Sequence, residues 1–95
     1  QMQHHIIVKW NSKVEDKRAL CPEIDALFRK TLAIPGVHKI EVVPNIIDRP
    51  IRYDLMIRMT MEEEALPAYD ASPWHAEWKE RYGSLMESKA IFDCV

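Results

Sequence analysis

Residues 69–78, which read YDASPWHAEW, set the interpretation of the whole chain. Ser72 is a favourable N-cap, because its hydroxyl can accept from a free amide of the first turn, and Pro73 suits the first helical position. The stretch therefore predicts a helix that starts at Pro73. His75 falls in the first turn, where the positive end of the helix dipole disfavours a second proton on the imidazole. Tyr69 precedes the cap, so a phenol and a neutral imidazole are expected to converge at one corner of the fold.

The helix that starts at Pro73 carries aromatic residues at four-residue spacing: Trp74, Trp78 and Tyr82. Such a stripe could belong to a cofactor site, but packing of a helix on a sheet is its commoner cause, and we assign it to the core. Gly83 is a natural C-terminal stop. Residues 88–95 then alternate, which predicts the last strand. Ala90, Phe92 and Cys94 would lie on one face and Ile91, Asp93 and Val95 on the other.

The residues before Tyr69 predict a short helix and a strand. Thr60 and Glu63 form a capping box, and acidic residues 62–64 suit a helix start. Pro67 interrupts this helix, so a bend or a new start is expected there. Residues 52–61 alternate, which predicts a strand with these side chains on one face: Tyr53, Leu55, Ile57, Met59 and Met61.

The N-terminal half predicts two further strands around a helix. Residues 3–10 alternate, with His4, Ile6, Val8 and Trp10 on one face and His5, Ile7 and Lys9 on the other. Ser12 and Glu15 form a capping box that predicts a helix start. Pro22 then requires either a kink or a true start nearby. The helix presents an apolar face at three- and four-residue spacing: Leu20, Ile24, Leu27, Phe28 and Thr31. Residues 34–36 end it, and residues 37–43 predict a strand.

The predicted order is β-α-β-β-α-β, which is typical of a ferredoxin-like α+β fold with a four-stranded antiparallel sheet and helices on one face. We predict a single domain over residues 3–95, leaving out Gln1 and Met2, which carry no structural signal. Apolar residues lie on both faces of the strands. A small domain of this kind predicts a homodimer, in which a second subunit covers the open sheet face.

Composition excludes several classes of partner. The chain has 95 residues, 47% of them hydrophobic, and 13 basic against 15 acidic residues give a net charge of -2. No basic run can follow a phosphate backbone, so no nucleic acid partner is predicted. No apolar run spans a bilayer and no signal peptide is recognisable, which favours a cytoplasmic protein without a membrane partner. Cys21 and Cys94 lack metal-ligand spacing and are predicted to be free, mostly buried thiols.

The chain resembles the stress-responsive A/B barrel (Dabb) domain family over nearly its whole length. The resemblance rests on the order and spacing of five segments: residues 4–10 (HHIIVKW), 34–37 (IPGV), 53–55 (YDL), 69–75 (YDASPWH) and 91–93 (IFD). The resemblance implies a dimer whose two sheets close into an α+β barrel. Where the family commonly has His-Pro-Ala-His, residues 72–75 read Ser-Pro-Trp-His, so one histidine is missing and Trp74 brings an indole.

The resemblance also implies a catalytic set. One plant member closes a linear polyketide thioester by aldol condensation, using a tyrosine and a histidine that Tyr69 and His75 match, and His4 matches a further histidine on its first strand. His75 would be a general base at carbon next to a carbonyl, with Tyr69 donating to the oxyanion. The alternatives are that His75 ties the helix to the sheet and that His4 is a hydrogen-bonded core residue. Metal binding is not predicted, because adjacent His4 and His5 point to opposite faces.

Three functions remain open. The first is a ligand-binding or polyketide-cyclase-like module of unknown physiological role, with a small apolar pocket lined by His4, Tyr69 and His75 and no cofactor. The second is a non-catalytic structural or stress-protective dimer, in which Trp74 closes the pocket. The third is a cofactor-independent monooxygenase of the related dimeric barrel type. Motifs for dinucleotides, nucleotides, serine hydrolases and zinc peptidases are absent from the sequence.

Overall fold

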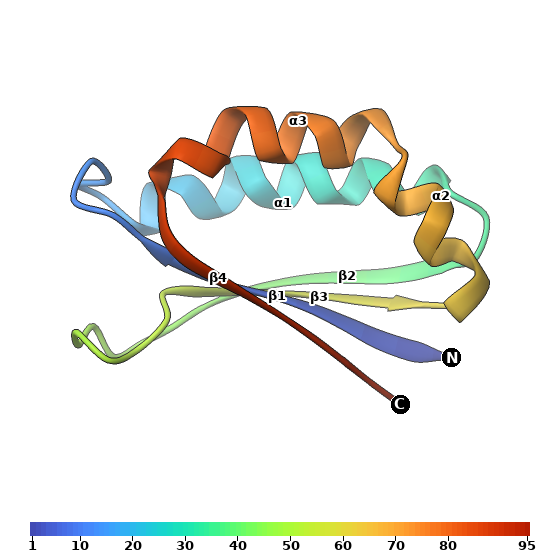
Figure 1. The fold of residues 1–95 in the computed structure, drawn as a ribbon, viewed down its shortest axis with the longest axis horizontal. Helices are drawn as coiled ribbons and strands as arrows, with labels where there is room; N and C mark the ends of the chain where they lie inside the picture. The colour runs from blue at the N-terminus through green and yellow to red at the C-terminus, as the bar shows by residue number, and fades with distance from the viewer.

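The computed structural model describes residues 1–95 and has the ferredoxin-like order that the sequence predicts. Its antiparallel sheet contains β1 (Met2–Trp10), β2 (Val37–Pro44), β3 (Leu55–Met61) and β4 (Met86–Cys94) in the order β2-β3-β1-β4. The helices are α1 (Cys21–Arg29), α2 (Leu66–Asp70) and α3 (Pro73–Tyr82). Figure 1 shows α1 and α3 side by side over one face of the sheet, while no element covers the other face. None of the helices has the length and apolar content needed to cross a membrane.

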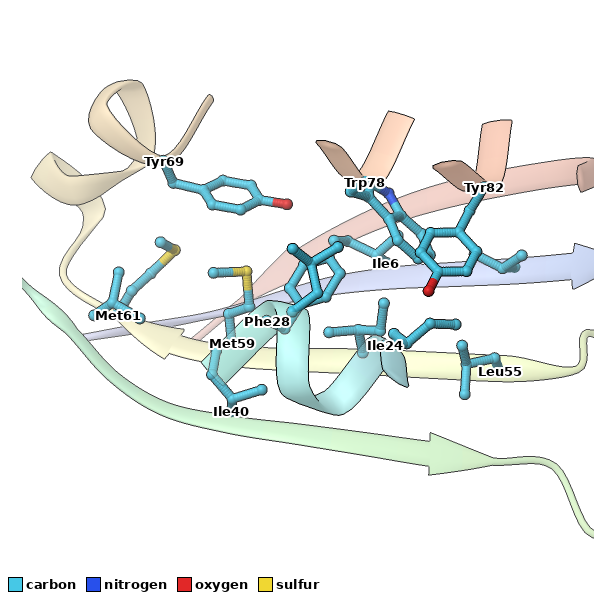
Figure 2. Close-up of a cluster of buried hydrophobic side chains, with 14 of the residues drawn as sticks. Ile6, Ile24, Phe28, Ile40, Leu55, Met59, Met61, Tyr69, Trp78 and Tyr82 are labelled. Atoms are coloured by element: carbon cyan, nitrogen blue, oxygen red, sulfur yellow. The ribbon is translucent and has the colours of Figure 1, made fainter. Parts of the chain in front are cut away.

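The core lies between the sheet and the helices. Alternate residues of β1 and β3 are buried, as their period predicts, and α1 and α3 add the aromatic part (Figure 2). The largest side chains with almost no exposed surface are Trp78, Tyr69, Tyr82 and Phe28. Trp78 packs edge-on against Phe28, with ring centroids 5.1 Å apart. The aromatic stripe of α3 is therefore core, except that Trp74 is only partly buried.

Helix α1 starts later than the Ser12 capping box predicts. Residues 11–17 form a connection, a 3₁₀ turn covers Arg18–Leu20, and Pro22 lies in the first turn of α1. The alternative, a true start near Pro22, is therefore confirmed. The physical reason lies in Asp54, whose carboxylate accepts from the Trp10 amide at 2.8 Å and from Lys17 Nζ at 2.9 Å. These bonds hold the connection against the sheet.

Strand β2 departs from simple alternation. Val37 and Ile40 are both buried, although strict alternation along residues 37–43 would place them on opposite faces. The pairing with β3 shifts between Val37 and Lys39. This bulge reverses which sheet face the side chains after it occupy. Strand β3 begins at Leu55 rather than Arg52, and Tyr53 is 37% exposed instead of facing the core, because it belongs to the loop after β2.

The connection from β3 to α3 contains one failed cap and one that forms. Thr60 donates its hydroxyl proton to Gln3 instead of capping, and Glu62 occupies the cap position of the turn Glu63–Ala65. Pro67 lies in the first turn of α2, so the predicted new start is correct. Ser72 caps α3 as predicted, accepting from the His75 amide at 3.2 Å.

The uncovered sheet face and edge strand β4 expose apolar side chains. Phe92 is 60% exposed, and Ile7 lies on the same face, since the β1–β4 register pairs His5 with Phe92 and Ile7 with Ala90.

Both cysteines are free, but Cys94 is exposed, which corrects the prediction of mostly buried thiols. Its exposure follows from its position at the end of an edge strand.

Candidate functional site

A pocket of ≈ 250 Å³ lies between the α2–α3 corner and the edge of the sheet formed by β1 and β4. All three predicted site residues line it: His4 from β1, Tyr69 from α2 and His75 from α3. Only five of its ten lining residues are hydrophobic, so the pocket is not the apolar one that was expected. Its ionisable lining residues come from β1, α2, α3 and β4: His4, Tyr69, Asp70, His75, Lys89 and Asp93.

The cap of α3 fixes His75 at the pocket. Its ring Nδ1 lies 3.0 Å from the main-chain carbonyl oxygen of Asp70. A carbonyl can only accept, so Nδ1 carries the proton in this contact and Nε2 keeps its lone pair. Burial lowers the pKa of His75 below its ordinary 6.5, and the charge of Lys79 and the weaker effect of Lys89 lower it further. The site therefore holds a neutral imidazole with a basic nitrogen available.

Tyr69 lies between the two histidines. Its ring centroid is 5.0 Å from that of His75 and 5.7 Å from that of His4, both in edge-on arrangements. The residue is 1% exposed, and its hydroxyl is the one buried side-chain polar atom without a hydrogen-bond partner. In Figure 2 this oxygen points towards the part of the core that holds Trp78, another residue of the pocket wall. Burial raises the pKa of Tyr69, so the phenol stays a proton donor.

His4 belongs to a pair that the sequence interpretation missed. Its Nδ1 lies 2.5 Å from Oδ1 of Asp93, its register partner on β4. His4 is buried, with 7% of its side chain exposed, whereas the Asp93 side chain is 44% exposed. The hydrogen bond to the carboxylate orients the ring and leaves Nε2 without a protein partner. Alternation along β4, together with the neighbourhood of β1 and β4 in a ferredoxin-like sheet, could have predicted this pair.

The other candidate residues lie in different parts of the structure. His5 lies on the opposite sheet face, where Nδ1 donates to the Phe92 carbonyl at 3.0 Å, as alternation predicts. Trp74 does not line the pocket, so its indole does not close it. Lys89 does line it, and sequence reasoning missed this residue as well. A larger, shallower depression of ≈ 470 Å³ lies over the uncovered sheet face beside Ile7 and Met56 and contains no ionisable group apart from the Tyr53 phenol.

Solved structures of similar fold support the architecture. A dimeric ferredoxin-like protein of unknown function from Thermobifida fusca superposes with a TM-score of 0.79 at 16% identity, covering 99% of this chain and 89% of that one. A Dabb family protein with a ferredoxin-like fold from Mesorhizobium loti gives 0.74 at 19%, covering 99% and 94%. The hydroxynitrile lyase of Passiflora edulis gives 0.74 at 14%, covering 98% and 90%. No family model and no curated protein matches the sequence. At such identities the likeness establishes the ferredoxin-like fold alone.

Proposed function

We propose that this chain is the subunit of a homodimeric, cofactor-independent enzyme of the Dabb type that removes a proton from carbon next to a carbonyl group. The observation that carries the proposal is the unpartnered, buried hydroxyl of Tyr69 beside the neutral imidazole of His75. An unsatisfied buried hydroxyl costs about 1–3 kcal/mol of stability. A site that keeps such a group next to a general base has the two parts needed to bind and deprotonate a carbonyl compound.

The chemistry follows from these two groups. His75 Nε2 takes the proton from the carbon, while the Tyr69 hydroxyl donates a hydrogen bond to the carbonyl oxygen that becomes an enolate. In an aldol ring closure, the enolate carbon then bonds to a second carbonyl carbon of the same molecule, and the new alkoxide receives the proton from the imidazolium. Loss of water then makes the ring unsaturated: the imidazole takes a second carbon-bound proton and returns it to the leaving hydroxyl, which departs as water. His4, oriented by Asp93, is the third polar contact available to the substrate.

The homodimer is supported by the uncovered sheet face. Its apolar part includes Ile7, Val43 and Met56, and Phe92 and Ile46 remain 60% and 81% exposed. An apolar face of this extent is rarely left wet by a small domain. Several proteins of similar fold are described as dimeric. The pocket opens on the helix side, so dimerisation would leave it accessible.

A thioester assay tests the activity. A linear polyketide thioester is incubated with the wild type, with His75→Ala and with Tyr69→Phe, and the products of carbon–carbon ring closure are separated from the lactone that forms spontaneously. Carbon ring closure by the wild type that is lost in both variants is the expected result. If neither the wild type nor the variants differ from buffer and none binds the thioester, the chain is the non-catalytic structural dimer instead.

The hydroxynitrile lyase among the structural neighbours adds one point, which is that this fold can carry an enzyme activity. The substrate class of that enzyme gives no guide to the substrate of this chain, because 14% identity does not preserve a site. A monooxygenase reaction has no particular observation in its favour. The acid–base function is therefore the one that the Tyr69 and His75 geometry supports best.

A further inference from the structure

Strand β4 builds one wall of the pocket from three alternate residues: Lys89, Ile91 and Asp93. Their register partners on β1 are Val8, Ile6 and His4, which are buried under the helices, so all three β4 residues lie on the helix side of the sheet. Asp93 is held by His4 at 2.5 Å, and Ile91 is apolar. Lys89 is the one lysine of the wall, and the wall contains no arginine.

The ammonium group of Lys89 makes no ion pair and no hydrogen bond, and it differs from the other unpartnered lysines and arginines of the chain in lining this pocket. Lys17, by contrast, pairs with Asp48 and Asp54, and Arg81 pairs with Glu77 and Glu23. A lysine on an edge strand often serves only to prevent pairing with other chains. That role does not require a position in a pocket, whereas Lys89 lines the same pocket as His75 and Tyr69.

The other charges of the wall leave Lys89 available for a ligand. The carboxylate of Asp93 is paired with His4, and Asp70 is exposed and uses its main-chain carbonyl to hold His75. Burial and then Lys79 lower the pKa of His75, and the charge of Lys89 adds the smallest of the lowering effects. An anion bound at Lys89 would cancel this repulsion and make the neighbouring base stronger.

We propose that Lys89 binds a carboxylate of the substrate, so that the site takes small carbonyl compounds that also carry a carboxylate group. This inference rests on the proposed function and names its substrate class. The carbonyl oxygen would lie at the Tyr69 hydroxyl, the acidic carbon at His75 Nε2 and the carboxylate at Lys89. A cation such as an ammonium compound would be repelled at the same position.

Pairs of ligands that differ only in charge test the inference. Benzoylpropionate and levulinate are compared with benzoylpropionamide and levulinamide by titration into nitrogen-labelled protein, with amide NMR shifts around Tyr69 and His75 as the readout. We expect each acid to bind about two- to fivefold more tightly than its amide, the size of an ion pair with a solvent-exposed lysine. Lys89→Met should reduce this ratio to about one, and Lys89→Arg should retain it.

Lys39→Met is the matched control. Lys39 is an exposed lysine on β2, the opposite edge strand, and lies outside the pocket. Its replacement removes the same charge and should leave the acid preference unchanged. Equal binding of acids and amides at the site would overturn the role of Lys89 while leaving the proposed function standing, as would an acid preference that survives in Lys89→Met. Absence of any shift around Tyr69 and His75 with all four ligands would overturn both.

Discussion

His4 Nδ1 and Asp93 Oδ1 share a hydrogen bond of 2.5 Å although the two residues lie 89 positions apart in the chain. The bond joins the centre of the sheet to its edge strand, and it engages Nδ1 of the His4 ring, leaving Nε2 without a protein partner. The two ends of the chain are therefore both needed to complete the site (Figure 1).

Replacing Asp93 by Asn should weaken this contact without removing it. A charge-assisted hydrogen bond becomes a neutral one, and because Asp93 is partly exposed we expect a loss of about 1 kcal/mol in the free energy of unfolding. Urea denaturation measures the change. Glu87→Gln, on the same strand and without a partner, should leave the stability unchanged; an equal loss in both variants would mean that β4 responds to charge alone.

Tyr69→Phe should separate stability from function. The variant removes a buried hydroxyl that has no partner, so we expect the free energy of unfolding to stay the same or to rise by about 1 kcal/mol. Binding of carbonyl ligands should weaken at the same time. Thermal melts and ligand titrations provide the two readouts.

Tyr82→Phe is the control for that variant, because the Tyr82 hydroxyl donates to Glu23 at 2.7 Å. Its removal should lower the stability by about 1 kcal/mol and leave ligand binding intact. A Tyr69→Phe protein that is less stable than Tyr82→Phe would contradict the absence of a partner for the Tyr69 hydroxyl.

His75 should make both turnover and stability fall at acidic pH. Its pKa in the folded chain is lowered, first by burial and then by Lys79, so the unfolded chain takes up a proton before the folded one does. The free energy of unfolding should therefore decrease as the pH falls from 6.5 through the folded pKa, and should be unaffected by this group above 6.5. The wild type minus His75→Gln difference in stability, measured against pH, isolates this contribution. A flat difference would contradict it.

Phe92→Glu should dissociate the proposed dimer. Light scattering on the wild type is expected to give about twice the mass of one chain, and the variant the mass of one, because a charge would be buried in the apolar interface. Ile51→Glu is the control, since Ile51 is 92% exposed in the loop between β2 and β3. A monomeric wild type would remove the barrel from the proposal.

The two glycines should respond in opposite directions to alanine. Gly36 has φ +95°, and a Cβ there would lie 3.0 Å from the Ala65 Cβ. Gly36→Ala should therefore cost about 1–2 kcal/mol. Gly83 has φ −56° and no atom within 4 Å of such a Cβ, so Gly83→Ala should stabilise the chain by about 0.5–1 kcal/mol. Equal effects in urea denaturation would contradict the left-handed conformation at Gly36.

Short-range sequence signals correctly predicted the elements that depend on contacts between residues close in the chain. The Ser72 cap and Pro73 place the start of α3 correctly, and alternation in β1 and β3 predicts which side chains are buried. The Ser12 and Thr60 capping boxes failed for the opposite reason. Asp54 holds the connection after β1 against the sheet, and Thr60 bonds to Gln3 on the neighbouring strand, so contacts distant in sequence replaced the local ones.

The sequence by itself determined the ferredoxin-like order and the identity of Tyr69, His75 and His4 as the residues of the candidate site, because periodicity, caps and the Dabb resemblance all lie within short segments. Only the tertiary structure decided that Asp93 orients His4 and that Lys89 stands unpaired on the same wall. Both depend on the register between β1 and β4, the two ends of the chain. The sequence around a strand residue does not show which residue it will face on the neighbouring strand. That partner is set by how the strands pair.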